Sequence, residues 1–114
     1  MDSDFDEFLH APARLTVVAL LAPASWTEFG FIRDSVGTSD SALSKQLSAL
    51  AAEGYVEVRK QPGAGARRTL ARLTPHGRKA FLAHASALER IAAAARAPQP
   101  ADPGTVQPTS VEAV

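Results

Sequence analysis

The spacing of the apolar residues changes at Gly54, and this change limits the folds open to the chain. Before Gly54, apolar side chains recur at helical intervals, at Leu43, Leu47, Leu50 and Ala51. They predict a helix over residues 39–53 that Ser39 caps and Gly54 ends. After Gly54, apolar and polar residues alternate up to Lys60, which predicts a strand with Val56 and Val58 facing inward. A helix that leads directly into a strand indicates a mainly helical fold with a small sheet.

An earlier helix is predicted over residues 12–22, because Pro12 suits a first helical turn and Pro23 ends the helix. Apolar side chains lie on nearly every face of this helix, so we expect it to be buried on two sides. A domain of this size covers one side, and a second subunit would cover the other. A short helix is expected before it, carrying Phe5, Phe8 and Leu9.

A further helix and a hairpin complete the middle of the chain. Thr27 is expected to cap a helix that Gly37 ends in a left-handed turn. Residues 61–66 are rich in turn-forming residues and predict a loop, and residues 67–74 predict the strand that returns from it. The position of Leu70 does not fit the alternation of that strand.

The last helix is predicted to begin at Pro75, with Thr74 as its cap. Its apolar side chains are spaced by four and three residues, at Phe81, Ala85, Leu88, Ala92 and Ala95. Such a seam is typical of packing against another helix. Residues 1–96 are therefore expected to form one domain. Residues 97–114 contain four prolines and no apolar period, which predicts a disordered tail.

Composition narrows the cellular context. The sequence contains no cysteine, which excludes disulfides and thiolate metal sites. No stretch approaches the ~18 apolar residues of a membrane span, and the acidic start of the chain is unlike a secretory signal. We therefore expect a cytoplasmic protein without a membrane partner.

The formal net charge is zero, but the charges are unevenly distributed. Residues 1–44 carry seven acidic and two basic side chains, whereas residues 45–90 carry nine basic and three acidic ones. A charged segment is most often a solvated surface. A basic segment in the middle of the chain is also what binding to a polyanion such as nucleic acid requires.

The predicted elements follow the order of a winged helix-turn-helix domain, in which the third helix enters the major groove of DNA and a basic hairpin reaches the flanking backbone. The third helix presents small or cationic polar residues, which fit a groove ~12 Å wide. An ordinary amphipathic helix would present a similar face, but the basic hairpin that follows it favours DNA. The predicted DNA-binding residues are Ser39, Ser41, Ser44, Lys45, Ser48, Arg59, Lys60, Arg67, Arg68 and Arg72.

Several stretches also carry recognisable motifs: Leu43-Ser-Lys-Gln-Leu47 and Glu53-Gly-Tyr-Val56 within residues 40–60, Arg72-Leu-Thr-Pro-His-Gly-Arg78, and residues 10–21. Together they resemble compact bacterial winged-helix regulators of the MarR/ArsR type. The resemblance implies a groove helix at residues 39–53 and a wing at residues 59–72. It further implies a homodimer that joins through its terminal helices, binds a palindromic operator and represses transcription, on the nucleoid of a bacterial cell.

The dimer interface is predicted to lie on the first long helix and the last helix, at Leu15, Val18, Leu21, Phe81, His84, Ala85, Leu88, Ile91 and Ala92. No metal site is predicted, because His76 and His84 are two helical turns apart and cysteine is absent. No hydrolase motif or phosphate-binding loop occurs, so neither an enzyme nor a cofactor is expected.

Other functions are compatible with the same fold. A winged helix can serve protein–protein assembly without DNA, which would require an uncharged wing and an apolar outer face on the third helix. Structured RNA is a weaker alternative to duplex DNA. A small-molecule effector of unknown chemistry is a further partner, in a site near Trp26, Phe29, His10 and the last helix.

Overall fold

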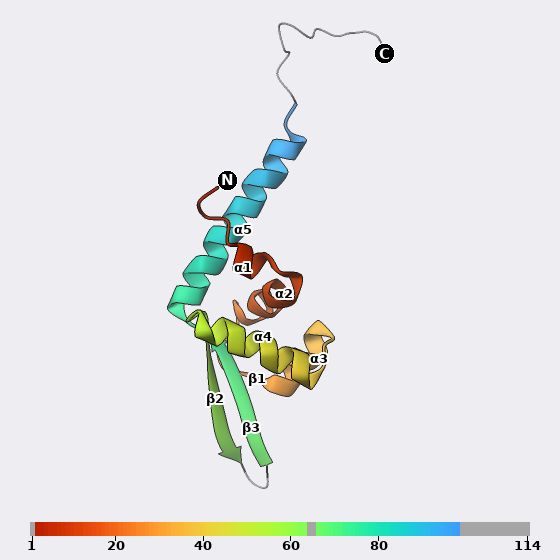
Figure 1. The fold of residues 1–114 in the computed structure, drawn as a ribbon, viewed down its shortest axis with the longest axis vertical. Helices are drawn as coiled ribbons and strands as arrows, with labels where there is room; N and C mark the ends of the chain where they lie inside the picture. Colours follow the sequence, from red (N-terminus) through yellow and green to blue (C-terminus); the bar gives the residue numbers. More distant parts are fainter. Residues whose placement is uncertain (1, 64–65, 99–114) are drawn as a thin grey trace, which may run out of the picture.

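The computed structural model describes residues 2–63 and 66–98 of the chain. In chain order the elements are α1 (Glu7–His10), α2 (Pro12–Leu21), β1 (Thr27–Glu28), α3 (Phe29–Val36), α4 (Asp40–Ala52), β2 (Val56–Gly63), β3 (Ala66–Leu73) and α5 (Pro75–Arg96). A body of short helices lies between the β2–β3 hairpin and the far end of α5 (Figure 1). The predicted fold, mainly helical with a small antiparallel wing, is confirmed. The predicted tail lies outside the described residues from residue 99 onward.

The sheet has three antiparallel strands in the order β1-β3-β2, so β3 is the central strand. The prediction that Thr27 caps a helix is wrong. Thr27 pairs with Ala71 in the sheet, and its hydroxyl donates to the carbonyl of Ser25 at 2.9 Å. Glu28 occupies the N-cap position of α3 without a side-chain cap. Pairing with β3 keeps residues 27 and 28 extended, and a sequence signal for a cap does not reveal a strand partner.

The central strand buries side chains on both of its faces. Ala71 and Leu73 are 1% and 6% exposed and join the hydrophobic core. Leu70 is also 6% exposed, although alternation places it on the opposite face, where it pairs with Arg59. This second buried face explains why Leu70 does not fit the predicted alternation. Val58 lies on the core face of the sheet, as predicted, but it is 40% exposed because it extends beyond the core.

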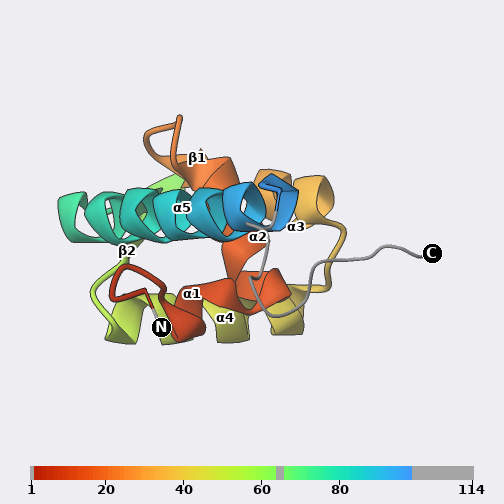
Figure 2. The same ribbon diagram turned by 90° about the horizontal axis from the view of Figure 1, so that it is seen from above.

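One chain buries one side of the first long helix. Val17, Val18 and Leu21 of α2 are at most 1% exposed, and they pack with Leu9 of α1 and Ile32 of α3 in the core. These three residues need no second subunit for their burial, whereas Leu15 on the same helix is only partly buried. Figure 2, seen from above, shows α5 nearest the viewer with the other helices behind it.

The predicted ends of α3 and α4 agree with the structure. Gly37 and Gly54 have positive φ angles of 71° and 77°, the left-handed conformation that favours glycine. The Ser39 hydroxyl accepts the amide hydrogen of Ala42 at 3.2 Å, so it caps α4. The predicted stripe on this helix is buried at its three leucines, whereas Ala51 is exposed. The stripe attaches α4 to the core and leaves its polar side free.

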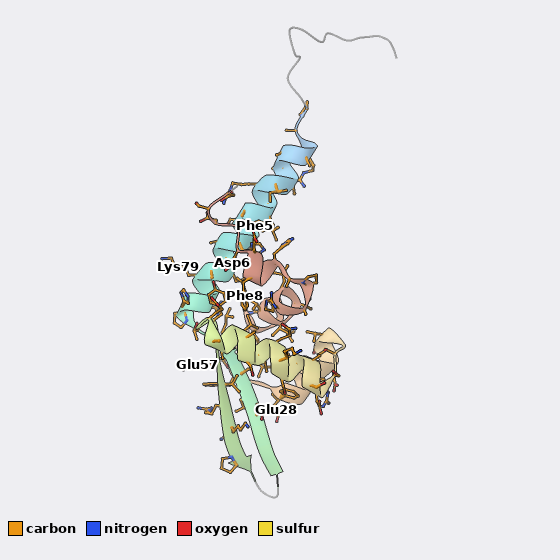
Figure 3. The ribbon with its side chains drawn as sticks, viewed as in Figure 1. Phe5, Asp6, Phe8, Glu28, Glu57 and Lys79 are labelled. Atoms are coloured by element: carbon orange, nitrogen blue, oxygen red, sulfur yellow. The ribbon has the colours of Figure 1, made fainter. Side chains whose placement is uncertain are left out.

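A cluster of polar side chains around the buried His84 connects the N-terminal segment to α5. His84 is 0% exposed, and its Nδ1 accepts the amide hydrogen of Asp6 at 2.9 Å. Its Nε2 lies 3.2 Å from Nδ1 of His10. The Tyr55 hydroxyl donates to the Asp6 carboxylate at 2.6 Å, and the ring of Phe5 contacts His84 edge-on. Figure 3 labels Phe5 and Asp6 in this N-terminal segment. The cluster thereby joins three parts of the chain: α1, the turn before β2, and α5.

The surroundings of these groups shift two pKa values. Burial lowers the pKa of His84, and the neighbouring His10 lowers it further, against an opposing effect of Asp6. Burial also raises the pKa of Tyr55 to about 12, with a further contribution from its hydrogen bond to Asp6. Both shifts favour the neutral side chains.

Gly77 provides a test of the close approach between α5 and the turn before β2. Gly77 lies in a helix, where other residues would be accommodated by the backbone conformation. A Cβ atom at this position would, however, overlap the backbone carbonyl oxygen of Tyr55. We expect Gly77→Ala to lower the unfolding free energy by about 1–3 kcal/mol, because the backbone must shift. Gly30→Ala is the control, since a Cβ there meets only the end of Arg33 at 3.5 Å. Urea unfolding measures both variants, and equal stability of the two would contradict the close contact.

The buried histidine predicts a pH-dependent stability. Because the folded pKa of His84 lies below its ordinary value of 6.5, the unfolded chain takes up the proton more readily. The stability that neutral His84 contributes to the fold is complete above pH 6.5. It is lost as the pH falls from 6.5 toward the folded pKa of His84. We expect urea midpoints to fall between about pH 7.5 and about pH 5.5, and to fall less in His84→Gln. In His76→Gln, which replaces an exposed histidine, the urea midpoint should fall as much as in the wild type. A fall of the same size in His84→Gln would show that His84 does not cause the pH dependence.

Candidate nucleic-acid interface

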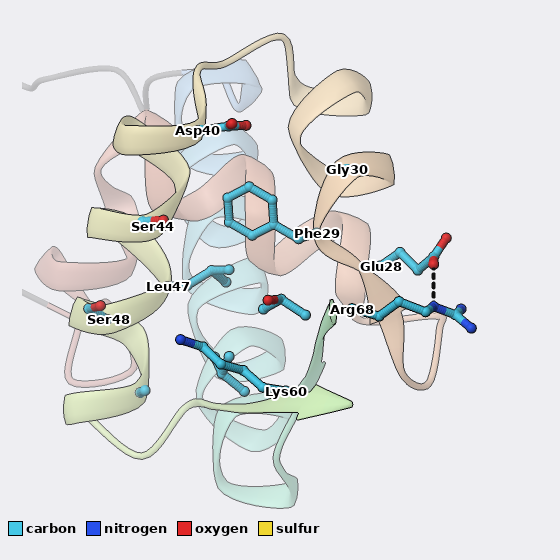
Figure 4. Close-up of a pocket in the computed structure, with 12 residues that line it drawn as sticks. Glu28, Phe29, Gly30, Asp40, Ser44, Leu47, Ser48, Lys60 and Arg68 are labelled. Atoms are coloured by element: carbon cyan, nitrogen blue, oxygen red, sulfur yellow. Dashed lines mark hydrogen bonds and ion pairs between the residues drawn. The ribbon is translucent and has the colours of Figure 1, made fainter. Parts of the chain in front are cut away.

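A groove of about 800 Å³ separates α4 from the hairpin (Figure 4). On the helix side it is lined by Asp40, Ser44, Leu47, Ser48 and Ala51. On the other side it is lined by Val58, Lys60, Arg68 and Thr69 of the hairpin and by Glu28, Phe29 and Gly30. Its walls therefore carry small hydroxyl groups on the helix and a lysine on the wing.

Strand alternation decides which basic side chains reach this groove. Lys60 pairs with Thr69 and Val58 pairs with Ala71, so these four residues share the face of the sheet that turns toward α4. Figure 4 shows the Lys60 side chain extending toward α4, on the side of Ser48. The groove thus brings together three of the predicted DNA-binding residues, Ser44, Ser48 and Lys60.

The two carboxylates that line the groove are each bound by an arginine. Nη1 of Arg33 lies 2.8 Å from the Asp40 carboxylate, and Nε of Arg68 lies 2.6 Å from the Glu28 carboxylate. Arg33 also binds Asp34 at 2.9 Å and holds the pKa of that carboxyl below its usual value. Both acidic side chains are therefore paired with an arginine, and Lys60 is a cation of the groove that forms no ion pair within the described residues.

The structure separates Arg59 and Arg72 from the groove. Both guanidinium groups lie over the ring of Trp26, at 4.2 Å and 4.5 Å from its centroid. Arg72 also binds Glu57 at 2.8 Å. Arg59 pairs with Leu70, and Arg72 pairs with Glu57. Both arginines therefore lie on the face of the hairpin that turns away from α4. The sequence predicts one basic wing, whereas the structure has two basic faces with different neighbours.

The other predicted DNA-binding residues that the structure describes lie at the N-terminal end of α4, on its exposed surface or beside Glu28. Ser39 is the N-cap of α4, while Ser41 and Lys45 are exposed on that helix outside the groove. Arg68 lines the groove, but its side chain turns toward Glu28 (Figure 4). The side chain of Arg67 lies outside the described part of the chain.

Sequence analysis missed the apolar part of the groove. Phe29 and Val58 both line it, and the signal that could have revealed Val58 is its place two residues beyond the buried Val56. Within one chain, the residues predicted to surround an effector at the dimer junction lie apart: Trp26 lies against the outer face of the hairpin, Phe29 lines the groove, and His10 contacts His84.

The predicted dimer residues fall into two groups. Val18, Leu21 and His84 are 0% exposed within one chain. They offer no surface to a second copy, which corrects the prediction at these three positions. Ile91 is 50% exposed, and five further predicted residues are partly exposed: Leu15, Phe81, Ala85, Leu88 and Ala92. The available surface therefore lies mainly on α5.

Two other kinds of site are absent from the described residues. Within residues 2–63 and 66–98, no three metal-ligating side chains come together. In the same part of the chain, no helix has the length and apolar character needed to cross a membrane.

The family model named Winged helix DNA-binding domain matches residues 13–92. The chain belongs to this family. The matched region runs from α2 into the second half of α5, so it contains α4, the hairpin and the groove between them. The expectation of a DNA-binding protein of winged-helix fold is confirmed at this level.

This chain is similar in sequence to one curated protein and in fold to a solved structure. An uncharacterized protein of Methanocaldococcus jannaschii is 28% identical over 75 residues, which cover 66% of this chain and 82% of the relative. A transcriptional regulator homologue from Pyrococcus horikoshii superposes with a TM-score of 0.76 at 22% identity, covering 81% of this chain and 91% of that one.

Two further solved structures are more similar in sequence. The transcriptional repressor BigR from Xylella fastidiosa is 29% identical, with a TM-score of 0.58, and the match covers 75% of this chain and 79% of that one. A homodimeric winged helix-turn-helix DNA-binding domain from Mycobacterium bovis, described as a possible ArsR-family regulator, is 27% identical, with a TM-score of 0.55. That match covers 77% of this chain and 73% of the other.

Proposed function

We propose that this protein is a cytoplasmic transcriptional regulator that binds a specific palindromic sequence in duplex DNA as a homodimer. The observation that carries the proposal is the groove between α4 and the hairpin, in which hydroxyl groups on the helix face a lysine on the wing. Membership of a family of DNA-binding domains supports it. Protein–protein assembly through the same face is disfavoured, because the wing side of the groove carries Lys60 and the helix side exposes Ser44 and Ser48.

In a winged-helix complex the third helix enters the major groove and the wing approaches an adjacent groove, so one sugar–phosphate strand passes between them. The groove beside α4 is the place for that strand. Lys60 would neutralise a phosphate there, and Ser44 and Ser48 would donate hydrogen bonds to phosphate oxygens. Ser41 and Lys45, exposed on the outer side of α4, would face the base edges. Arg59 and Arg72 have no place in this contact.

Sequence discrimination by these residues would be moderate. The strongest base contacts come from bidentate arginine or amide side chains, and α4 offers the bases short hydroxyls and Lys45. Part of the specificity would therefore depend on the shape and flexibility of the DNA. A homodimer doubles the contact and requires two half-sites related by two-fold symmetry.

The dimer would form through α5. This helix carries Ile91 in an exposed position, with Leu88 and Ala92 partly exposed on the same side of the helix, since the three are spaced at i, i+3 and i+4. The homodimeric relative from Mycobacterium bovis supports this assembly. Repression follows as the simplest action, because a dimer that occupies an operator excludes polymerase from it, and the BigR repressor is a relative that acts in this sense.

Selection of bound sequences from random duplex DNA tests the proposal. We expect the wild-type chain to enrich a palindrome whose half-sites are centred about 10 bp apart. Ile91→Glu places a charge on the α5 surface and should yield a monomer that enriches a single half-site more weakly. Ser86→Glu, at an exposed position on another side of α5, is the control and should remain a dimer. Absence of any enriched motif at moderate salt would overturn the proposed function, and a dimeric Ile91→Glu would overturn the interface.

Adjacent residues on opposite faces of β2 allow a sharper test of the groove. We expect Lys60→Gln to weaken DNA binding and to reduce the slope of log K against log salt by about 0.9, the contribution of one phosphate contact. Arg59→Gln removes the same charge from the outer face and should leave the slope unchanged. Fluorescence anisotropy with labelled duplex at several salt concentrations measures both. Equal slopes for the two variants would remove the groove from the binding mechanism.

A further inference from the structure

Two histidines and Asp6 form a continuous line of hydrogen bonds between the N-terminal segment and α5. The backbone N–H of Asp6 donates to Nδ1 of His84 at 2.9 Å, so this nitrogen carries no proton. The neutral ring of His84 therefore carries its proton on Nε2, and this N–H group donates to Nδ1 of His10, 3.2 Å away. His10 in turn must carry its proton on Nε2. The contacts thus fix the tautomers of both rings.

This line of hydrogen bonds has no place for an additional proton. A proton on Nδ1 of His84 would face the amide hydrogen of Asp6, one donor against another. A proton on Nδ1 of His10 would face the Nε2–H group of His84 in the same way. His10 is exposed to solvent, whereas His84 is 0% exposed. Protonation of either ring therefore breaks a hydrogen bond that the buried His84 makes.

The Asp6 carboxylate offers the protonated ring of His84 a new partner. In the structure this carboxylate accepts from the Tyr55 hydroxyl at 2.6 Å and from the amide of Leu9 at 3.1 Å. Burial and the neighbouring His10 hold the pKa of His84 below its ordinary value, and the Asp6 carboxylate is the group that opposes them. Once Nδ1 of His84 is protonated, an ion pair with Asp6 replaces the lost amide hydrogen bond. Tyr55 then loses its acceptor.

Two ionic contacts hold the N-terminal segment to α5 independently of the histidines. Nε of Arg90 lies 2.6 Å from the Asp2 carboxylate, and its Nη2 lies 3.0 Å from the Asp4 carboxylate. The hydrogen bond from Arg90 lowers the pKa of Asp2, so this contact persists where histidines titrate. The segment therefore stays attached to α5 while Asp6 changes its partner.

Tyr55 connects this cluster to the groove beside α4. It lies between α4 and β2, the two elements that form opposite walls of the groove. Its backbone N–H donates to the carbonyl of Leu50 in α4 at 2.9 Å, and its own carbonyl accepts from the amide of Thr74 at 3.0 Å. Release of the Tyr55 hydroxyl from Asp6 thus loosens the joint that positions α4 relative to the hairpin.

We propose that His10, His84 and Asp6 form an acid-sensitive switch that weakens DNA binding as the pH falls. This regulation rests on the proposed binding of duplex DNA through the groove. At neutral pH both rings are neutral and Asp6 holds Tyr55. In acid, Asp6 turns to the protonated His84 and releases Tyr55. The expected direction is opposite to simple electrostatics, because protonated histidines add positive charge, which strengthens binding to a polyanion.

Anisotropy titrations at constant salt, with a duplex that carries the selected palindrome, test the switch. We expect the wild-type affinity to fall about fivefold or more between about pH 7.5 and about pH 5.5. The fall should be absent in His84→Gln, whose side chain takes up no proton. Tyr55→Phe lacks the hydroxyl, so it should bind more weakly already at neutral pH and show no further fall. His76→Gln is the control: it removes an exposed histidine outside the line, and its affinity should fall as in the wild type.

NMR spectra of the full chain supply a second measurement, without DNA. Long-range proton–nitrogen correlations at neutral pH should show His10 and His84 as Nε2–H tautomers. On acidification, the amide signal of Asp6 should shift together with the ring signals of His84. The amide signals of the central strand β3 should keep their positions, because the change is local.

Four outcomes would overturn the switch. They are an unchanged or rising wild-type affinity in acid, an equal fall in His84→Gln, an Nδ1–H tautomer of His84 at neutral pH, and loss of the β3 signals over the same pH range, which would mean that the whole fold melts. Absence of duplex binding at neutral pH would instead overturn the proposed function. The spectra without DNA would still decide whether the histidines and Asp6 exchange partners.

Discussion

The alternation of side chains along the two hairpin strands determines what each face of this protein can do. Lys60 and Arg59 are neighbours in sequence, but one reaches the groove beside α4 and the other lies over Trp26 on the opposite face. The central strand β3 fixes this division, because Ala71 and Leu73 are buried on one side and Leu70 on the other. A slip of one residue in register would exchange the two faces. The position of Lys60, and with it the surface proposed to bind DNA, therefore depends on apolar burial elsewhere in the hairpin.

The position of α4 relative to the hairpin depends on a second constraint, at the turn that joins them. Gly77 brings α5 against the backbone of Tyr55, and the Thr74 hydroxyl donates to the carbonyl of Gly54 at 2.6 Å. The Tyr55 hydroxyl in turn binds Asp6, whose amide binds the buried His84. The end of α4, the start of α5 and the N-terminal segment are thus joined by a few polar contacts. Such contacts fix relative orientation more strictly than apolar packing does.

Much of this architecture could be predicted from the sequence, because it depends on local signals. The cap at Ser39, the left-handed glycines and the leucine stripe of α4 are all short-range features. The errors have non-local causes. Thr27 carries a cap signal but pairs with β3, and Val18 and Leu21 need no partner subunit because α1 and α3 supply cover that periodicity does not reveal. The two faces of the basic hairpin likewise required the register with Leu70 and the position of Trp26.

The two arginines that stack on Trp26 illustrate why charge counting alone overstates a DNA surface. A guanidinium group held over an aromatic ring, and in Arg72 also paired with Glu57, must give up those contacts before it can bind a phosphate. Lys60 has no such cost, because its flexible side chain extends into the groove. A chain whose net charge is zero can in this way carry, among its described residues, an unpaired lysine on one face of its hairpin and two engaged arginines on the other.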